Sequence, residues 1–361
     1  MDQSLWIANS TSNDYKDFHA STPASDLSLL LGTNFWTIHD DTKTCSPNGT
    51  YTAWLTLTGC TTTEFTCGDG NCVAMEQRCD GRRQCEDGTD ESDCKLVNPA
   101  VGYDKFLTPP PVDHREEEMV VNMTLNIIDI INIDQVKGLF YTMVSVQIKW
   151  FDGGLTYHNL KSESQRNQIN VEAESIWSPF VVFIPVENAK KIEPMQDFSL
   201  WQVDATDVSD FEPGDNTNNN NVYKFSGDKN AQDRTTQNSI EWVCNFDLFW
   251  YPFDTQTCDL QFYIKQNYAK LHPKKFIYSG PMKLIEFDIK NYSICPTMIN
   301  GKQGATASIV FGRPLISNIL TVFIPTLILL VISHVANRFD QSYVDMVIGV
   351  NLTVLLVLAS L

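Results

Sequence analysis

The chain between about residue 103 and residue 313 is patterned in short runs in which apolar and polar residues alternate. Examples are VVNMTLNIIDIINID, KGLFYTMVSVQIKWFD, SPFVVFIPV, DLQFYI, KLIEFDIK and TASIVF, separated by clusters of Gly, Asn, Asp and Pro. A period of two residues places every second side chain on one face, as in a half-buried β-strand. The pattern predicts an all-β sandwich of about ten strands.

Two continuous apolar runs follow. Residues 314–336, PLISNILTVFIPTLILLVISHVA, contain no Asp, Glu, Lys or Arg, and their length suits a helix that crosses the hydrocarbon layer. Pro325 in this run is tolerated where neighbouring groups satisfy the freed carbonyl. A second run covers residues 345–361. We expect two membrane helices, the second one truncated. The alternative is one anchor followed by a buried or hairpin segment.

The cysteines indicate an oxidising compartment. Ten cysteines sit mostly at short spacings, which is typical of disulfides formed outside the cytosol. Candidate glycosylation sequons occur at Asn9, Asn48, Asn122 and Asn291. The first thirty residues lack the basic start and apolar run of a signal peptide, so we expect a missing N-terminal segment.

Charge and motif content exclude two classes of function. A net charge of −18 argues against a nucleic-acid partner, because phosphate backbones require clustered Lys and Arg. The six histidines are scattered, and we find no nucleophile and base at catalytic spacing, no phosphate loop and no metal-hydrolase motif. The sequence therefore gives no support for an enzyme.

A small module is expected over residues 60–95. Six cysteines fall within CTTTEFTCGDGNCVAMEQRCDGRRQCEDGTDESDC, whose end is strongly acidic. A core of this size needs disulfides or a metal to be stable. Carboxylates and carbonyls in one tight loop suit calcium. The alternative is an acidic disulfide loop without metal, and spacing alone leaves fifteen pairings of the cysteines open.

The stretches EFTC, CDG and TDESDC resemble the low-density-lipoprotein receptor class A module. The resemblance implies the disulfides Cys60–Cys72, Cys67–Cys85 and Cys79–Cys94. It also implies a structural calcium ion held by side chains of Asp80, Gln84, Asp90 and Glu91 and by the carbonyls of Gln77 and Arg82. Gln84 stands where the family has an acid, which should weaken the site by removing one negative charge.

Residues 1–59 form a separate β-rich segment. LGTNFWTIHDDTKTCSPNGTYTAWLTLTGC alternates around an Asn-Gly pair, a pattern that predicts a β-hairpin. The segment is compatible with the end of a larger β domain, such as a lectin-like sandwich. The partners of Cys45 and Cys295 stay open.

The order of motifs after residue 100 carries a second resemblance. CNFDLFWYPFDTQTC holds thirteen residues between Cys244 and Cys258, and NIDQVKG, KWFDGGLTY, IWSP, NYSICP and GRPLISNILTVFIP stand around it. Together, over about 103–361, they resemble the extracellular domain and first membrane helices of the Cys-loop, or pentameric ligand-gated, ion channels. The resemblance implies a Cys244–Cys258 disulfide and a ligand-binding β-sandwich over residues 100–313.

The resemblance also implies residues for ligand binding and for coupling. The implied ligand-binding residues are Trp150, Trp177, Tyr263, Lys265 and Tyr292. Lys265 would repel a cationic ligand, which argues against acetylcholine; alternatively, it is a solvated surface lysine. For coupling to the membrane helices, the resemblance implies that Asp134 and Asp254 meet Arg313 beside the turn Tyr251-Pro252-Phe253. Gln135 stands where the family has a glutamate.

In the second membrane helix, the resemblance places Thr353 on the polar stripe of the pore, Leu356 at its hydrophobic girdle and Asp345 at its mouth. A ring of Asp345 carboxylates favours cations, whereas a linker one residue longer than usual points to anions. Asp345 is alternatively a helix N-terminal acid. We expect a plasma-membrane, multi-pass subunit that joins four others in a pentamer and opens a pore, cation-selective rather than anion-selective, when a small extracellular ligand binds. The alternative is a non-conducting receptor or adhesion protein that uses the module.

Overall fold

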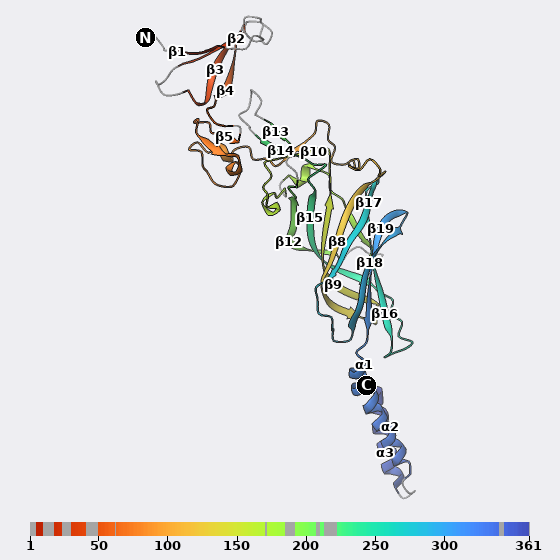
Figure 1. Cartoon of the computed structure of the whole chain (residues 1–361). Helices are drawn as coiled ribbons and strands as arrows, with labels where there is room; N and C mark the ends of the chain where they lie inside the picture. The colour runs from red at the N-terminus through yellow and green to blue at the C-terminus, as the bar shows by residue number, and fades with distance from the viewer. Residues whose placement is uncertain are drawn as a thin grey trace. The chain divides into compact units, whose positions relative to one another are not determined.

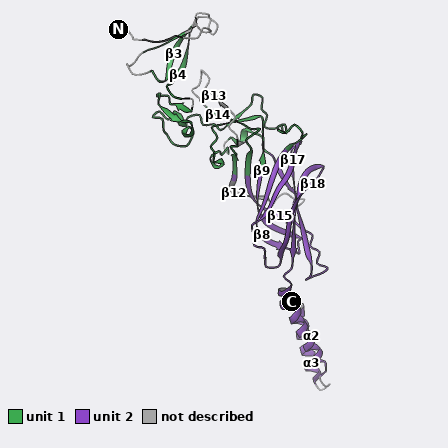
Figure 2. Ribbon diagram, viewed as in Figure 1, with its two compact units in different colours: residues 1–119, 149–178, 200–234 green, residues 120–148, 179–199, 235–361 purple. Residues whose placement is uncertain are grey.

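The computed structural model describes residues 5–9, 18–23, 30–40, 50–61, 63–169, 172–184, 192–206, 210–212, 222–338 and 343–360. Figure 1 shows the order of the elements along the chain. Two compact units are present: residues 1–119, 149–178 and 200–234 form the first, and residues 120–148, 179–199 and 235–361 form the second (Figure 2).

The N-terminal segment is a four-stranded antiparallel sheet of order β1-β2-β3-β4. Its strands are β1 (Leu5–Asn9), β2 (Phe18–Pro23), β3 (Gly32–Asp40) and β4 (Thr50–Leu57). The predicted hairpin is β3-β4, in which Phe35 pairs with Trp54. Its turn, with Cys45 and the Asn48 sequon, lies outside the described residues. In β3, Trp36 and Ile38 are buried, whereas Phe35 is 47% exposed, as expected when neighbouring side chains of a strand alternate between faces.

The cysteine module follows directly. It consists of β5 (Glu64–Thr66), β6 (Cys72–Ala74) and two 3₁₀ turns, η1 (Met75–Gln77) and η2 (Thr89–Glu91). Three disulfides join Cys60 to Cys72, Cys67 to Cys85 and Cys79 to Cys94, and these are the pairs that the resemblance implies. Among the described residues, its apolar core is small and contains Phe65, Cys67, Met75 and Cys85 with Val73 and Tyr223 against them, so the cross-links carry much of the stability.

Two sheets form the predicted sandwich. One has the order β12-β15-β9-β8-β17 and the other β11-β16-β19-β18. The first contains β12 (Ile192–Val203), β15 (Gln232–Val243), β9 (Leu139–Trp150), β8 (Met119–Asp134) and β17 (Ala269–Tyr278). The second contains β11 (Val181–Ile184), β16 (Thr255–Ile264), β19 (Lys302–Gly312) and β18 (Asp288–Ile299). Buried and half-buried residues alternate along β8 and β9, as their sequence pattern predicts.

Aromatic side chains fill the space between these sheets. Trp242 of β15 meets Phe183 of β11 and Phe262 of β16 edge-on, with ring centroids 6.1 and 5.6 Å apart. Phe140 of β9 meets Phe311 of β19 at 6.0 Å. The indole Nε1 of Trp242 donates to Oγ1 of Thr142 at 2.7 Å, so its one polar group is satisfied inside the core.

A third sheet, of order β13-β14-β10-β7, lies in the first unit. Its strands are β13 (Asp210–Glu212), β14 (Val222–Ser226), β10 (Leu155–His158) and β7 (Val97–Pro99), and the 3₁₀ turns η3 (Ser164–Arg166) and η4 (Ala173–Ser175) follow β10 in the chain. The predicted Asn-rich loop, residues 214–221, lies outside the described residues.

The apolar runs at the end of the chain are helical. The first contains α1 (Leu315–Asn318), a π-helical turn η5 (Ile319–Phe323) and α2 (Ile324–Ala336). Pro325 is the second residue of α2, which follows the π turn directly, and such a turn re-routes the backbone hydrogen bonds that proline cannot make. The second run is α3 (Val344–Ser360).

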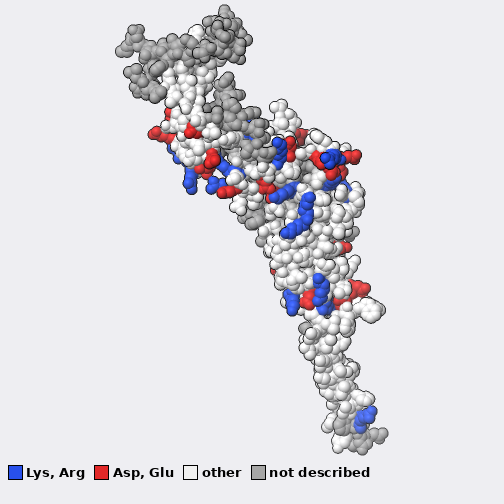
Figure 3. All heavy atoms as spheres, in the orientation of Figure 1, with Lys and Arg blue, Asp and Glu red and all other residues white. Residues whose placement is uncertain are grey.

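Among the described helices, the continuous segment 319–336 is long and apolar enough to span a membrane, whereas residues 344–358 form a shorter apolar helix. The face of these helices seen in Figure 3 carries almost no charged side chains. Oγ of Ser333 and the side chain of Asn337 both bond to the side chain of Asn351, which joins α2 to α3 through polar groups.

Candidate functional site

The ring closed by Cys244 and Cys258 presents an apolar projection. The disulfide joins the end of β15 to β16. Between them, Phe249, Trp250 and Phe253 are strongly exposed, whereas Pro252 and Asp254 are buried. Exposed aromatics of this kind on an otherwise folded domain mark a contact surface. The same ring therefore combines an outward apolar tip with an inward carboxylate.

Asp254 is paired with Arg313, which directly precedes the first apolar run. Nε of Arg313 donates to Oδ1 of Asp254 at 2.7 Å, and the two side chains are only 5% and 2% exposed. The guanidinium lies 4.7 Å from the ring centroid of Tyr251 and 4.6 Å from that of Phe287. A planar cation held between two rings keeps a fixed direction. We call Tyr251, Asp254, Phe287, Arg313 and Gln135 the base cluster.

Gln135 completes the base cluster from the turn after β8. A terminal nitrogen of Arg313 donates to Oε1 of Gln135, and Nε2 of Gln135 donates to Glu286. On the other side, Nε2 of Gln256 donates to Oδ2 of Asp254 at 2.6 Å. Satisfied hydrogen bonds on both partners are what a buried ion pair requires to offset its desolvation.

The expectation that Asp134 meets Arg313 is wrong. The Asp134 carboxylate forms a salt bridge with Lys137 at 2.9 Å and accepts the Lys137 backbone N–H. These hydrogen bonds from Lys137 lower the pKa of Asp134. Neighbouring residues at a strand end point to opposite sides, so only one of the pair can reach Arg313, and the tight turn leaves Asp134 with Lys137. Gln135 stands where the family has a glutamate, and this difference was the signal in the sequence that the contacts of Arg313 differ here.

The candidate ligand surface centres on Lys265 and Phe180. Nζ of Lys265 lies 5.7 Å from the Phe180 ring, and the Lys265 N–H donates to the Phe180 carbonyl at 3.0 Å. The Phe180 N–H donates in turn to Oε1 of Gln266 at 2.8 Å. Nζ of Lys302, beside the tight turn Asn300-Gly301, donates to the carbonyls of Lys265 and Gln266. Three segments thus meet here around an exposed cation and an exposed ring.

Two tryptophans assigned to ligand binding are core residues instead. Trp150 is 0% and Trp177 is 1% exposed. The Trp150 ring meets those of Trp177 and Trp201 at 6.2 and 5.6 Å. The reason is register: Trp150 occupies an inward position of β9, whose pattern strictly alternates. A ligand cannot reach either ring in this structure.

The structure also separates Tyr292 from Tyr263. In the β16-β19-β18 ladder, Phe262 pairs with Ala305 and Ala305 with Pro296, whereas Tyr292 pairs with Ile309. Four residues of strand correspond to about 13 Å. The Tyr292 ring lies against Phe276 and Tyr278 of β17, at 5.3 and 6.1 Å. Tyr263 is half-buried next to Lys265 and shares its end of the sheet.

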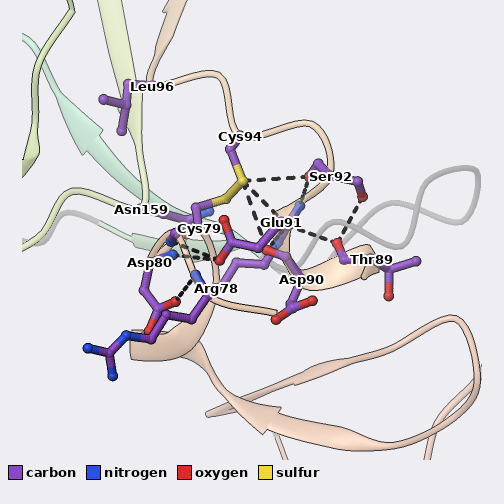
Figure 4. The surroundings of a disulfide bond; sticks show 12 residues. Arg78, Cys79, Asp80, Thr89, Asp90, Glu91, Ser92, Cys94, Leu96 and Asn159 are labelled. Atoms are coloured by element: carbon purple, nitrogen blue, oxygen red, sulfur yellow. Dashed lines mark hydrogen bonds between the residues drawn. A yellow bond between two sulfur atoms is a disulfide. The ribbon is translucent and has the colours of Figure 1, made fainter. Parts of the chain in front are cut away.

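The module contains oxygen donors suited to calcium. Oδ1 of the fully buried Asp90 and Oε1 of Gln84 have no hydrogen-bond partner, and such oxygens fit a hard cation. No three His, Cys, Asp or Glu side chains converge on a metal position within the described part of the chain. Oε1 of Glu91 accepts the N–H groups of Asp80 and Gly81, and Asp80 accepts from Arg82 and Gln84. Figure 4 shows these carboxylates around the Cys79–Cys94 disulfide. The donor chemistry fits calcium.

The other predicted sites that the structure describes lie on α3 and on strands. Asp345 lies in the first turn of α3, and Oγ1 of Thr353 donates to the Gly349 carbonyl within the helix. Leu356 is 62% exposed. Asn291 is exposed in β18 and Asn122 half-buried in β8, while Asn9 lies in β1. Cys295 is exposed and free of disulfides in the described residues.

Removing the ring disulfide should destabilise the β-sandwich. For Cys244→Ser with Cys258→Ser we expect a loss of about 3 kcal/mol, because a cross-link closing a loop of this size restricts the unfolded chain by that amount. Urea unfolding of the purified chain measures it. Cys295→Ser is the control and should change little; equal effects of the two variants would contradict the expectation.

Comparison with known proteins is consistent with this arrangement. Residues 95–207 match the family model of the neurotransmitter-gated ion-channel ligand binding domain, and residues 58–94 match that of the low-density lipoprotein receptor domain class A. The module region is 54% identical over 46 residues to chicken (Gallus gallus) SCO-spondin, covering 12% of this chain and 1% of that protein.

Two relatives from Caenorhabditis elegans cover the larger domain. The serotonin-gated chloride channel mod-1 is 24% identical over 280 residues, 71% of this chain and 48% of that protein. The acetylcholine receptor subunit beta-type lev-1 is 26% identical over 180 residues, 49% of this chain and 30% of that protein. The chain spans about half the length, or less, of the curated relatives it matches. The chain is thus similar to the ligand-binding domain of neurotransmitter-gated ion channels over residues 95–207, and to the low-density lipoprotein receptor class A domain over residues 58–94, which precede it.

Proposed function

We propose that the chain is part of a subunit of a pentameric, extracellular ligand-gated ion channel in the plasma membrane. The observation that carries the proposal is the base cluster, because Arg313 is bonded to Asp254 of the disulfide ring and stands two residues before α1. A movement of the sandwich at this point is passed on to the first membrane helix. A ligand shifts the closed-to-open equilibrium by its differential affinity for the two states.

The ligand is proposed to bind at the Lys265 and Phe180 surface, with Tyr263 beside it, at the boundary between subunits. An exposed lysine cation next to an aromatic ring recognises a ligand that carries an anionic group and a flat or apolar part. A quaternary amine is disfavoured, because Lys265 repels it and the buried Trp150 and Trp177 cannot form a cage. Serotonin and acetylcholine, named for the relatives, are the reference ligands to exclude.

The pore is proposed to be lined by α3, with Thr353 on its polar side, Leu356 at the constriction and Asp345 at the mouth. Five Asp345 carboxylates in a ring attract cations. One relative is a chloride channel by name and the other an acetylcholine receptor subunit, so the proposal for cations rests on Asp345. The module is proposed to bind calcium through Asp80, Gln84, Asp90 and Glu91, with the Gln77 and Arg82 carbonyls, as such modules generally do.

The test is electrical recording from oocytes that express the complete receptor while amino acids, amines and organic anions are screened. We expect an agonist-evoked current whose reversal potential follows external sodium. Lys265→Gln should raise the half-maximal concentration of an anionic agonist about tenfold, because one charge-assisted contact is lost. Lys275→Gln, an exposed lysine of β17, is the matched control. A reversal potential that follows chloride would overturn the cation proposal. Surface expression without current for any ligand would favour a non-conducting receptor.

A further inference from the structure

The module is joined to the ligand-binding domain by a short connection whose second residue, Leu96, is bonded at both of its backbone groups. Only Lys95 and Leu96 separate Cys94 from β7. The Leu96 N–H donates to Oε1 of Glu172 at 3.0 Å, and its carbonyl accepts the His158 N–H at 2.8 Å. A linker whose backbone groups are bonded in this way does not behave as a flexible tether. The module is therefore seated on the domain.

Lys161 reaches back from the ligand-binding domain into the module. Its Nζ donates to the carbonyl of Glu76 at 2.8 Å and to that of Arg78 at 2.7 Å. These two residues flank Gln77, whose own carbonyl is a proposed calcium ligand. The lysine thus takes two of the carbonyls around the calcium loop without using any oxygen of the proposed calcium site.

The loop that carries Lys161 is held rigidly. The Lys161 N–H donates to Oδ1 of Asn167 at 2.7 Å, and Nδ2 of Asn167 donates to the Lys161 carbonyl at 2.8 Å and to that of Val203 at 3.1 Å. Asn167 is fully buried. Fixing the lysine backbone lowers the entropy lost when its side chain binds the module.

A second contact also holds the module against the ligand-binding domain. Tyr223 of β14 packs against the small module core that contains Met75, the residue before Glu76. Its backbone is paired with Asn159, whose N–H donates to the Tyr223 carbonyl at 2.8 Å while its Oδ1 accepts the Tyr223 N–H at 2.9 Å. The Tyr223 ring and the Lys161 ammonium group thus both contact segment 75–78 of the module.

We propose that Lys161 couples calcium binding in the module to the seating of the module on the ligand-binding domain, so that extracellular calcium regulates this domain. The inference rests on the calcium assignment made under the proposed function. Calcium would hold the Gln77 and Arg82 carbonyls, and Lys161 bonds the carbonyls on either side of Gln77, so each favours the conformation that the other needs. Such coupling is reciprocal. Calcium strengthens the contact between module and domain by a certain factor, and that contact strengthens calcium binding by the same factor.

Hydrogen exchange of the purified full chain, in calcium chloride and in EGTA, tests the proposal without requiring current. In the wild type we expect removal of calcium to speed exchange in segments 77–91 and 159–167. In Lys161→Met, segment 159–167 should exchange fast in both buffers, and the calcium affinity of segment 77–91 should fall about fivefold or more. Lys161→Arg, which can still donate to both carbonyls, should restore the coupling.

Two internal controls sharpen the outcome. The other side of the module meets the N-terminal sheet, where the Thr33 N–H donates to the Gly68 carbonyl at 2.8 Å; this amide lies away from the calcium loop and should not respond. Lys275→Met should behave as the wild type. A response confined to segment 77–91, or a wild-type response in Lys161→Met, overturns the coupling alone. No response in segment 77–91 overturns the calcium assignment as well.

Discussion

Arg313→Gln is expected to lower the free energy of unfolding of the second unit by about 3–5 kcal/mol, because it leaves the buried Asp254 carboxylate without its partner. Both side chains are almost completely buried, so water cannot replace the guanidinium. The same substitution should abolish agonist-evoked current in the complete receptor. Urea or thermal unfolding of the purified chain and recording from oocytes measure the two effects.

Second variants separate charge from packing in the base cluster. Arg313→Gln combined with Asp254→Asn should recover part of the lost stability, since no unpaired charge is left, and the difference gives the coupling energy of the pair. Arg313→Lys keeps the charge but loses the planar group between Tyr251 and Phe287, and should recover less than half of the current. Arg115→Gln, at an almost fully exposed arginine, is the control. Equal unfolding curves for Arg313→Gln and the control would refute this account.

Trp150→Ala is expected to cost about 3–5 kcal/mol, the usual loss when a buried aromatic ring is truncated in a core. The ring is fully buried and contacts Trp177 and Trp201, so its removal leaves a cavity that these rings cannot fill. Trp54→Ala, at an exposed tryptophan that contacts Phe35, should cost about 1 kcal/mol or less. Denaturant unfolding of the purified chain measures both.

The same substitution decides between a structural and a ligand-contact role. Trp150→Phe keeps most of the buried ring and should leave agonist potency unchanged at the cell surface. If Trp150→Phe instead changed potency strongly while the unfolding curve stayed the same, the tryptophan would be a ligand contact in some other conformation, and its assignment to the core would be wrong.

Local periodicity accounts for most of the elements that the sequence predicts. β8, β9, β16 and β19 appear where alternation is regular, because the pleat of a strand and the pattern share one period. β12, β14 and β15 lie outside the quoted runs. The half-buried positions of β14 and β15 mix polar and apolar residues, so the period is weak there. The π turn before Pro325 also follows from a local cause, the missing N–H of proline.

The base cluster was predicted in part. The ring with Asp254 and the position of Arg313 follow from motifs that are contiguous in the sequence. Its further members, Gln135 and Phe287, come from segments far from the ring and from Arg313. Spacing in the sequence contains no information about which of these distant side chains converge.

By itself, the sequence determined the classes of the elements and the presence of the module, because strand alternation, cysteine spacing and continuous apolar runs act over a few residues. Only the tertiary structure decided which side chains are partners and which face each one takes. It places Gln135 instead of Asp134 at Arg313 and Trp150 in the core. It also separates Tyr292 from Tyr263 and brings Lys161 onto the module. Each depends on strand register and on how separate segments pack, and a shift of one residue along a strand turns a side chain to the opposite face.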